Sequence, residues 1–220
     1  MRASPAPAGD ARPAPRRETR LRLEGQLRSP VAPQVAAAPA DDWVQTQASL
    51  RGATPAMTEA TLKSFVGAHP GPVAARQALV TALLQGNRVA EAVPVLRDGL
   101  AAAPEQVGWA MTLARIQAGS NDYSAAYETL TKSAAHAQAL PDYQAFVGTV
   151  LQRLDRAAEA LTHYEAALRA RPQEARWWVG YGIALEAAGR MADAREAYAR
   201  ARGIGGLTTE VRQFVDERLR

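Results

Sequence analysis

The sequence predicts an all-α protein made of consecutive helical hairpins. From about Trp43 onward the chain is rich in alanine, leucine, glutamine, arginine and glutamate, which favour helices, and its apolar residues recur three and four positions apart. We find no strand-like alternation of apolar and polar residues. Related residues also return every 34 positions, which indicates a stack of similar helix pairs.

Residues 1–42 precede the helical part and differ from it in composition. Positions 1–40 contain seven prolines, ten alanines and few bulky apolar side chains, and their seven arginines and three acidic residues account for the whole net charge of +4. Such a segment buries too little apolar surface to offset the entropy lost on ordering, so we expect a disordered linker rich in proline, alanine and arginine. Because the rest of the chain is neutral overall and contains no base-reading module, nucleic-acid binding is not expected.

The 34-residue pattern has small residues at some fixed positions and large residues at others. A small residue on the first helix of a pair lets the second helix approach closely, and a large side chain four positions after the alanine of the second helix fills the space toward the next pair. Trp178 is expected in the apolar core of the last pair. The residues that define the pattern are Ala92, Ala126, Gly148, Ala160, Tyr164, Trp178, Gly182, Ala194 and Tyr198.

The period divides the chain into units. We expect a solenoid over 43–206, made of a half unit at about 55–70 and four units at about 73–106, 107–140, 141–174 and 175–206, followed by a capping helix at 207–220. Residues 42–50 hold few bulky apolar side chains, so no first helix is expected for the half unit. In the capping segment, Val211, Phe214, Val215 and Leu219 fall on one helical face, and Thr208 is the expected N-cap. Pro94 is expected to kink its helix.

The spacing of these residues resembles the signature of tetratricopeptide repeat (TPR) proteins. The last unit reads Trp178-x2-Tyr181-Gly182-x2-Leu185, followed by Ala194-x3-Tyr198, as in the pattern W-x2-L-G-x2-Y … A-x3-F. The resemblance implies a right-handed superhelix of antiparallel helix pairs. It also implies a scaffold that binds a protein or peptide and is not an enzyme.

In TPR proteins the first helices line a concave groove where peptides lie. Arg115 and Arg153, about one unit apart, are interpreted as a pair that binds a carboxylate of the partner, with solvated surface arginines as the alternative. The resemblance places the following residues on the groove: Gln77, Thr81, Met111, Arg115, Ala145, Thr149, Gln152, Arg153, Arg176, Val179, Ile183 and Glu186.

We expect no catalytic residue, metal site or cofactor. The chain has no cysteine, and its three histidines lie far apart in the sequence without a metal-binding spacing. The glycines at 203–206 lack the lysine and serine or threonine that complete a phosphate-binding loop, so we interpret them as a helix-terminating turn. The expected partner is therefore a protein or peptide, and no small-molecule substrate is expected.

Residues 75–220 also resemble the C-terminal region of MshN-type proteins, which are accessory proteins of MSHA (type IV) pilus assembly. That resemblance implies a periplasmic location at the inner membrane, held by an anchor upstream of Met1, since such proteins begin with one membrane span and a proline-rich linker. The alternative is a cytoplasmic TPR adaptor with no pilus role. The segments that carry the resemblance are 75–80, 111–116, 142–146, 176–180, 182–186 and 214–219.

Overall fold

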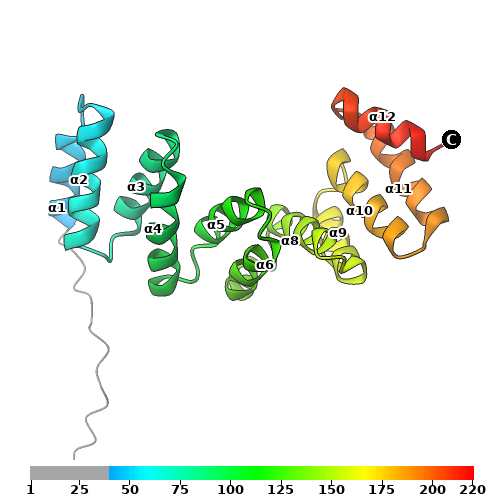
Figure 1. Ribbon diagram of the computed structural model, residues 1–220, viewed down its shortest axis with the longest axis horizontal. Coiled ribbons are helices and arrows are strands. Elements are labelled where there is room, and N and C mark those ends of the chain that lie inside the picture. Colours follow the sequence, from blue (N-terminus) through cyan, green and yellow to red (C-terminus); the bar gives the residue numbers. More distant parts are fainter. Residues whose placement is uncertain (1–39) are drawn as a thin grey trace, which may run out of the picture. The chain divides into compact units, whose positions relative to one another are not determined.

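The computed structural model describes residues 40–220, which form twelve α-helices and no strand (Figure 1). The predicted linker lies outside the described residues except for its last three positions. The all-α fold class is thus confirmed for the described part of the chain. The helices are α1 (Ala40–Ser49), α2 (Pro55–Ala68), α3 (Val73–Gln85), α4 (Val89–Ala102), α5 (Val107–Gly119), α6 (Tyr123–Lys132), α7 (Ala134–Ala137), α8 (Pro141–Arg153), α9 (Ala157–Ala170), α10 (Ala175–Ala187), α11 (Met191–Ile204) and α12 (Thr209–Arg218).

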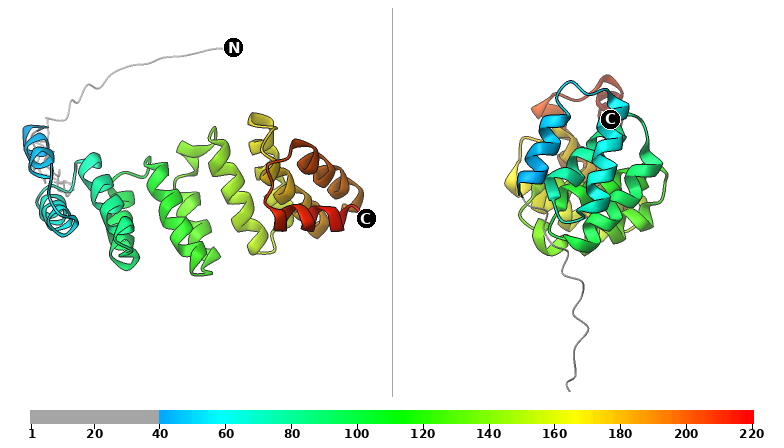
Figure 2. Two further views of the ribbon diagram at one scale, coloured as in Figure 1. Left: turned by 90° about the horizontal axis from the view of Figure 1, so that it is seen from above. Right: turned by 90° about the vertical axis from the view of Figure 1, so that its left-hand side faces the viewer.

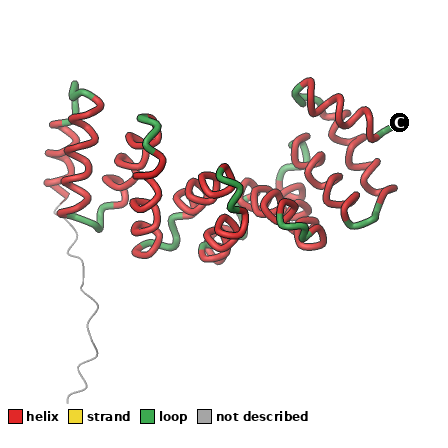
Figure 3. The backbone as a smooth tube through the Cα atoms, in the orientation of Figure 1, coloured by secondary structure: helices red, strands yellow, loops and turns green. Residues whose placement is uncertain are grey.

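The helices pack as consecutive hairpins. The pairs are α3 with α4, α5 with α6, α8 with α9 and α10 with α11, each joined by a short turn (Figure 3). Each second helix also packs against the first helix of the following pair, and α12 covers α11 (Figure 2). The side-chain hydroxyl of Thr208 accepts the backbone N–H of Val211, so the final helix has the expected N-cap.

The turns inside the hairpins share one backbone conformation. Asn87, Asn121, Asp155 and Gly189 follow one another at intervals of exactly one repeat period, and all four have positive φ, between 55° and 76°. Asparagine, aspartate and glycine are the residues that enter this left-handed region at least cost. The period of the sequence is therefore also a period of turn geometry.

Two helices differ from the sequence prediction. Although residues 42–50 are poor in apolar side chains, α1 forms, and the ring of Trp43 lies 5.3 Å from that of Phe65 on α2. Packing of one aromatic face thus compensates for weak local hydrophobicity. In the hairpin of α5 and α6 the second helix breaks at the buried Ser133, whose hydroxyl donates to the carbonyl of Pro104 at 2.9 Å. Helix α4, in contrast, continues through Pro94.

Glycine and tyrosine pack directly against each other between the helices. A Cβ atom on Gly148 would lie 3.0 Å from the Tyr164 ring, and one on Gly180, in the next unit, would lie 2.6 Å from it. A Cβ on Gly182 would lie 2.5 Å from the ring of Tyr198. Tyr164 therefore fills the space between two units, as the sequence predicts, and the glycines set how closely the helices approach.

Trp178 is less buried than the sequence predicts. Its indole N–H donates to the carbonyl of Pro172 at 2.8 Å, and its ring packs edge-on against Tyr181, but the side chain is only half-buried. The buried tryptophan is Trp109, which is 3% exposed and donates to Gln77 at 2.6 Å. Both indoles satisfy their N–H groups, Trp109 within the core and Trp178 at its edge.

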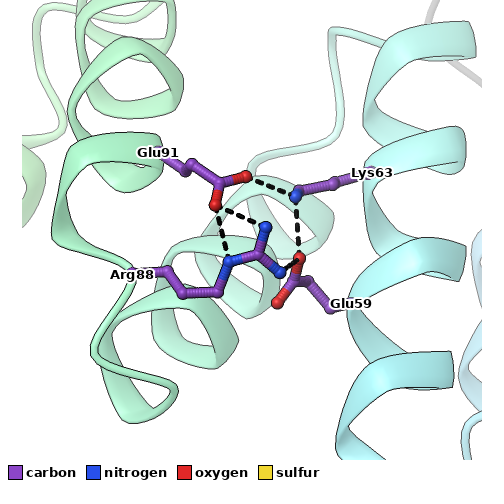
Figure 4. Close-up of polar contacts among 4 residues, drawn as sticks. All are labelled: Glu59, Lys63, Arg88 and Glu91. Carbon is purple, nitrogen blue, oxygen red and sulfur yellow. Dashed lines mark hydrogen bonds and ion pairs between the residues drawn. The ribbon is translucent and has the colours of Figure 1, made fainter.

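A four-residue charge network joins α2 to the start of α4 (Figure 4). Lys63 Nζ lies 2.7 Å from Glu59 and 2.6 Å from Glu91, and Arg88 contacts both carboxylates. The hydrogen bonds from Lys63 and Arg88 hold the pKa values of Glu59 and Glu91 below their ordinary values. The pKa of Lys63 is raised, first by its hydrogen bond to Glu59. The network therefore holds the half unit against the following hairpin.

The glycine–tyrosine contact gives a first prediction. Gly182→Ala should destabilise the protein by about 1–3 kcal/mol, because the added methyl group overlaps the Tyr198 ring within a packed core. Urea denaturation followed by circular dichroism measures the change. Gly108→Ala on α5 is the control, since its Cβ meets nothing within 4 Å and alanine favours the helix. An equal effect of both substitutions would contradict this account of the packing.

The charge network gives a second prediction. A carboxylate whose pKa is lowered by folding stabilises the protein above the pKa of the unfolded chain, near 4.5, and this stabilisation is lost as the pH falls. Glu91→Gln should therefore lower the melting temperature between pH 6 and 9 and have little effect at acid pH below the folded-state pKa. Thermal unfolding across the pH range measures this, with the exposed Glu196→Gln as control. A difference that is independent of pH would contradict an ionic origin.

Candidate protein-binding surface

The residues predicted to line the groove lie on the first helices α3, α5, α8 and α10, but they differ in exposure. Met111, Gln152 and Glu186 are half-buried, and Val179 is 6% exposed and Ala145 4% exposed, so these last two belong to the core. Val179 is part of the apolar core and cannot meet a partner. The exposed members of the set are Gln77, Thr81, Arg115, Thr149, Arg153, Arg176 and Ile183.

Several polar residues of the predicted groove already bond within the protein. The amide of Gln152 donates to the Gly180 carbonyl at 2.7 Å, and its carbonyl accepts the Tyr164 hydroxyl at 2.7 Å. Glu186 accepts the Tyr198 hydroxyl at 2.5 Å and pairs with Arg218 on the capping helix. These side chains fasten one unit to the next and are not free to bind a partner.

The first helices of three consecutive units surround a hollow of about 270 Å³. The hollow draws on α5, α8 and α10, with Tyr164 of α9 at its base. Four of its residues belong to the predicted groove set. Its lining residues are Arg115, Asp142, Ala145, Phe146, Thr149, Tyr164, Arg176 and Trp177.

The hollow combines two arginines with two aromatic rings. The Arg115 guanidinium lies 5.3 Å from the centre of the Phe146 ring, and the Arg171 guanidinium lies 4.5 Å from that of Trp177. Arg171 also pairs with Asp142, which neutralises the one acidic side chain of the lining. Among the described residues no ion pair involves Arg115 or Arg176, so the hollow carries a net positive charge.

Arg153 does not share this hollow with Arg115. Its guanidinium lies 5.0 Å from the centre of the Tyr123 ring and donates to the Tyr123 hydroxyl at 2.9 Å, which ties α8 back to α6. The structure thus places Arg115 with Arg176, two units away in the repeat, in place of the predicted pair with Arg153. The four-residue offset between Arg115 and the position equivalent to Arg153 moves the two side chains about one helical turn apart.

Tyr164 supplies a neutral hydroxyl at the base of the hollow. Burial raises the pKa of Tyr164 to about 12, so the group remains protonated at neutral pH. It donates to Gln152, and its oxygen lies 2.9 Å from the Thr149 hydroxyl. Because the Tyr164 hydroxyl already donates its proton to Gln152, the base of the hollow offers little to a ligand. The arginines and rings around it are the groups that can bind one.

The predicted groove set does not include the aromatic part of this surface. Phe146 and Trp177 are half-buried and line the hollow, although neither falls on a signature position of the repeat. Their signal lay in the sequence nonetheless, since both belong to first helices and neither is required by the 34-residue pattern. Large aromatic residues on first helices that the repeat signature does not require are the feature that indicates such a surface.

Other kinds of site find no support in the part of the chain that the structure describes. Within residues 40–220 no three histidine or acidic side chains converge as a metal site would require. No helix in that range has the length and apolar character needed to cross a bilayer.

Comparison with known proteins agrees with the repeat architecture. The tetratricopeptide repeat family profile matches residues 83–149 and again residues 148–206. No curated protein sequence matches the chain significantly. Solved structures of similar fold include several of MamA, whose low sequence identities to this chain support a likeness of fold alone.

Three of these MamA structures illustrate the likeness. A MamA crystal structure shares 18% identity and a TM-score of 0.60 over 74% of this chain and 86% of that one. MamA AMB-1 shares 22% identity and a TM-score of 0.62 over 79% and 93% of the two chains. A MamA RS-1 double mutant shares 16% identity and a TM-score of 0.63 over 74% and 91%. The two profile matches and the hairpin architecture together show that residues 83–206 of this chain contain tetratricopeptide repeats.

Proposed function

We propose that the chain is a non-enzymatic scaffold that holds an acidic segment of a partner protein in the hollow between Arg115 and Arg176. Tetratricopeptide repeats present extended surfaces for protein partners, and this hollow is formed by the first helices of three units. The observation that carries the proposal is its charge: two arginines face it, while its one carboxylate, on Asp142, is already paired with Arg171.

The neighbouring rings define what the acidic segment would look like. Arg115 rests against Phe146, which limits the motion of its side chain and leaves its N–H groups available. A carboxylate can take two parallel hydrogen bonds from one guanidinium. The Trp177 ring, one face of which Arg171 covers, also lines the hollow and suits an apolar side chain next to that carboxylate. An acidic residue beside an aliphatic or aromatic one is the expected motif.

We further propose that the partner is a component of MSHA-type pilus assembly. Six of the eight residues around the hollow fall within the segments 111–116, 142–146 and 176–180 that resemble MshN-type proteins. Helix packing does not require Asp142 or Arg176 at these positions, so a shared partner is a reason for the likeness. This role would place the domain at the periplasmic face of the inner membrane. A cytoplasmic adaptor is the alternative.

The test is affinity capture from envelope extracts of cells that express the native protein, followed by mass spectrometry. Arg115→Glu combined with Arg176→Glu should reduce capture of the bound partner at least about tenfold, because charge-assisted hydrogen bonds are lost and like charges are opposed. The matched control is Arg195→Glu with Arg212→Glu, two exposed positions outside the hollow that give the same change in charge.

The outcomes separate the two levels of the proposal. Equal loss of capture in both double variants would show a nonspecific charge effect and would remove the hollow as the binding site. Capture that depends on Arg115 and Arg176 but contains no pilus-assembly protein, together with normal surface pili after deletion of the gene, would replace the pilus role by the adaptor.

A further inference from the structure

Two more hollows are lined mainly by residues of second helices. One, of about 420 Å³, lies between α4, α5 and α6, and the other, of about 430 Å³, lies between α9, α10 and α11. We call them the α4–α6 hollow and the α9–α11 hollow. The first is lined by Arg97, Leu100, Ala101, Pro104, Leu113, Gln117, Ala125, Glu128, Thr129, Lys132 and Ser133, and the second by Glu165, Leu168, Arg169, Pro172, Trp178, Tyr181 and Arg200.

The two hollows occupy the same place in the repeat. All but one of the residues around the α9–α11 hollow, Trp178, stand 68 positions, or two periods, after a residue of the α4–α6 hollow. One equivalent position could arise by chance, but six equivalent positions show that the two hollows lie at the same place in the repeat. The equivalent pairs are Arg97 and Glu165, Leu100 and Leu168, Ala101 and Arg169, Pro104 and Pro172, Leu113 and Tyr181, and Lys132 and Arg200.

One shared feature, the basic residue, recurs in every second unit. It is present as Lys132 and Arg200, but the positions one period before them hold Asp98 and Ala166. The proline does not alternate in this way, because it is also present as Pro70, one period before Pro104, and is replaced only by Gln138 between the two hollows. A packing requirement of the repeat would appear in all units, so the alternation of the basic residue points to a requirement outside the fold.

Each hollow has an apolar wall with its local polar groups already satisfied. Leu100 and Leu168 form equivalent parts of the wall. The Pro104 carbonyl accepts the Ser133 hydroxyl, and the Pro172 carbonyl accepts the Trp178 indole N–H. What remains for a ligand is apolar surface beside a basic side chain, and both hollow volumes lie within the range of sites that bury a large side chain.

The charges of the two hollows also agree. Each is lined by two basic residues and one acidic residue, and in the α9–α11 hollow the acidic residue, Glu165, accepts the Tyr181 hydroxyl at 2.9 Å. Among the described residues no ion pair involves Arg97, Lys132 or Arg200. A complementary ligand therefore carries negative charge beside an apolar group.

We propose that the two hollows are a repeated docking site for a protein segment that presents two apolar side chains, each beside an acidic residue. The site is separate from the surface around Arg115 and Arg176, because the two share no lining residue. One hollow alone binds weakly. Two hollows engaged by one segment bind more tightly, since the second contact forms at the high effective concentration set by the first.

The test uses two synthetic peptides on the full chain. One contains a single phenylalanine flanked by glutamates, and the other contains two copies joined by flexible glycine and serine linkers of graded length. Fluorescence anisotropy should show the tandem peptide binding at least about tenfold more tightly at the linker length that spans both hollows. Either Lys132→Glu or Arg200→Glu should remove this gain. In a chain that also carries Arg115→Glu and Arg176→Glu, which removes binding at the first surface, the two together should abolish binding of the single-copy peptide.

The controls keep the result distinct from that of the first surface. Arg115→Glu with Arg176→Glu carries the same charge change and should leave the tandem gain intact, whereas loss of the gain in that variant would overturn the proposal. A tandem peptide that binds no more tightly at any linker length would also overturn it. Sedimentation velocity covers self-association: a dimer that Lys132→Glu with Arg200→Glu dissociates would identify the occupant as a second copy of this chain and refute the proposed partner.

Discussion

The fold depends on how closely a tyrosine ring approaches a glycine backbone. Tyr164 lies between Gly148 of its own unit and Gly180 of the next, where even one methyl group would come within 3.0 Å of ring atoms. This contact sets the distance between the helices of one unit and also the distance to the following unit. The hydroxyl of the same tyrosine binds Gln152, which reaches the Gly180 carbonyl, so the steric contact and the hydrogen bonds fix one geometry.

The period of the sequence carries the architecture because repeats contact only their neighbours. The helix hairpins and the pairing of Tyr164 with glycine follow from small and aromatic residues 34 positions apart, and the capping helix follows from its own apolar face. Helix α1 could not be anticipated from local composition, since it depends on a tertiary contact between Trp43 and Phe65. Trp178 shows a related limit: its position in the signature is correct, but its depth depends on the satisfaction of the indole N–H.

The binding surface was harder to predict than the fold. A face of a first helix is easily assigned from spacing, but spacing does not tell which polar side chains the next unit will use. Gln152 bonds the next unit, Glu186 bonds Tyr198 of its own unit and Arg218 of the capping helix, and Val179 is buried. Phe146 and Trp177, which the repeat pattern does not require, line the hollow instead. A sequence pattern thus locates the helices, and the competition for hydrogen bonds between units decides what remains for a partner.

Asn87, Asn121, Asp155 and Gly189 share one left-handed turn conformation, so the two helices of every hairpin are connected in the same way. Duplication or deletion of one whole repeat unit would rejoin its neighbours with matching geometry, so the architecture tolerates changes in length by whole units. The basic positions on the second helices have a longer period of two repeat units, because Lys132 and Arg200 alternate with Asp98 and Ala166. Gain or loss of one unit between them would preserve the stack but alter the spacing of its basic positions. A change in length by one hairpin would therefore keep the fold, whereas only a change by two hairpins would keep the period of the basic positions.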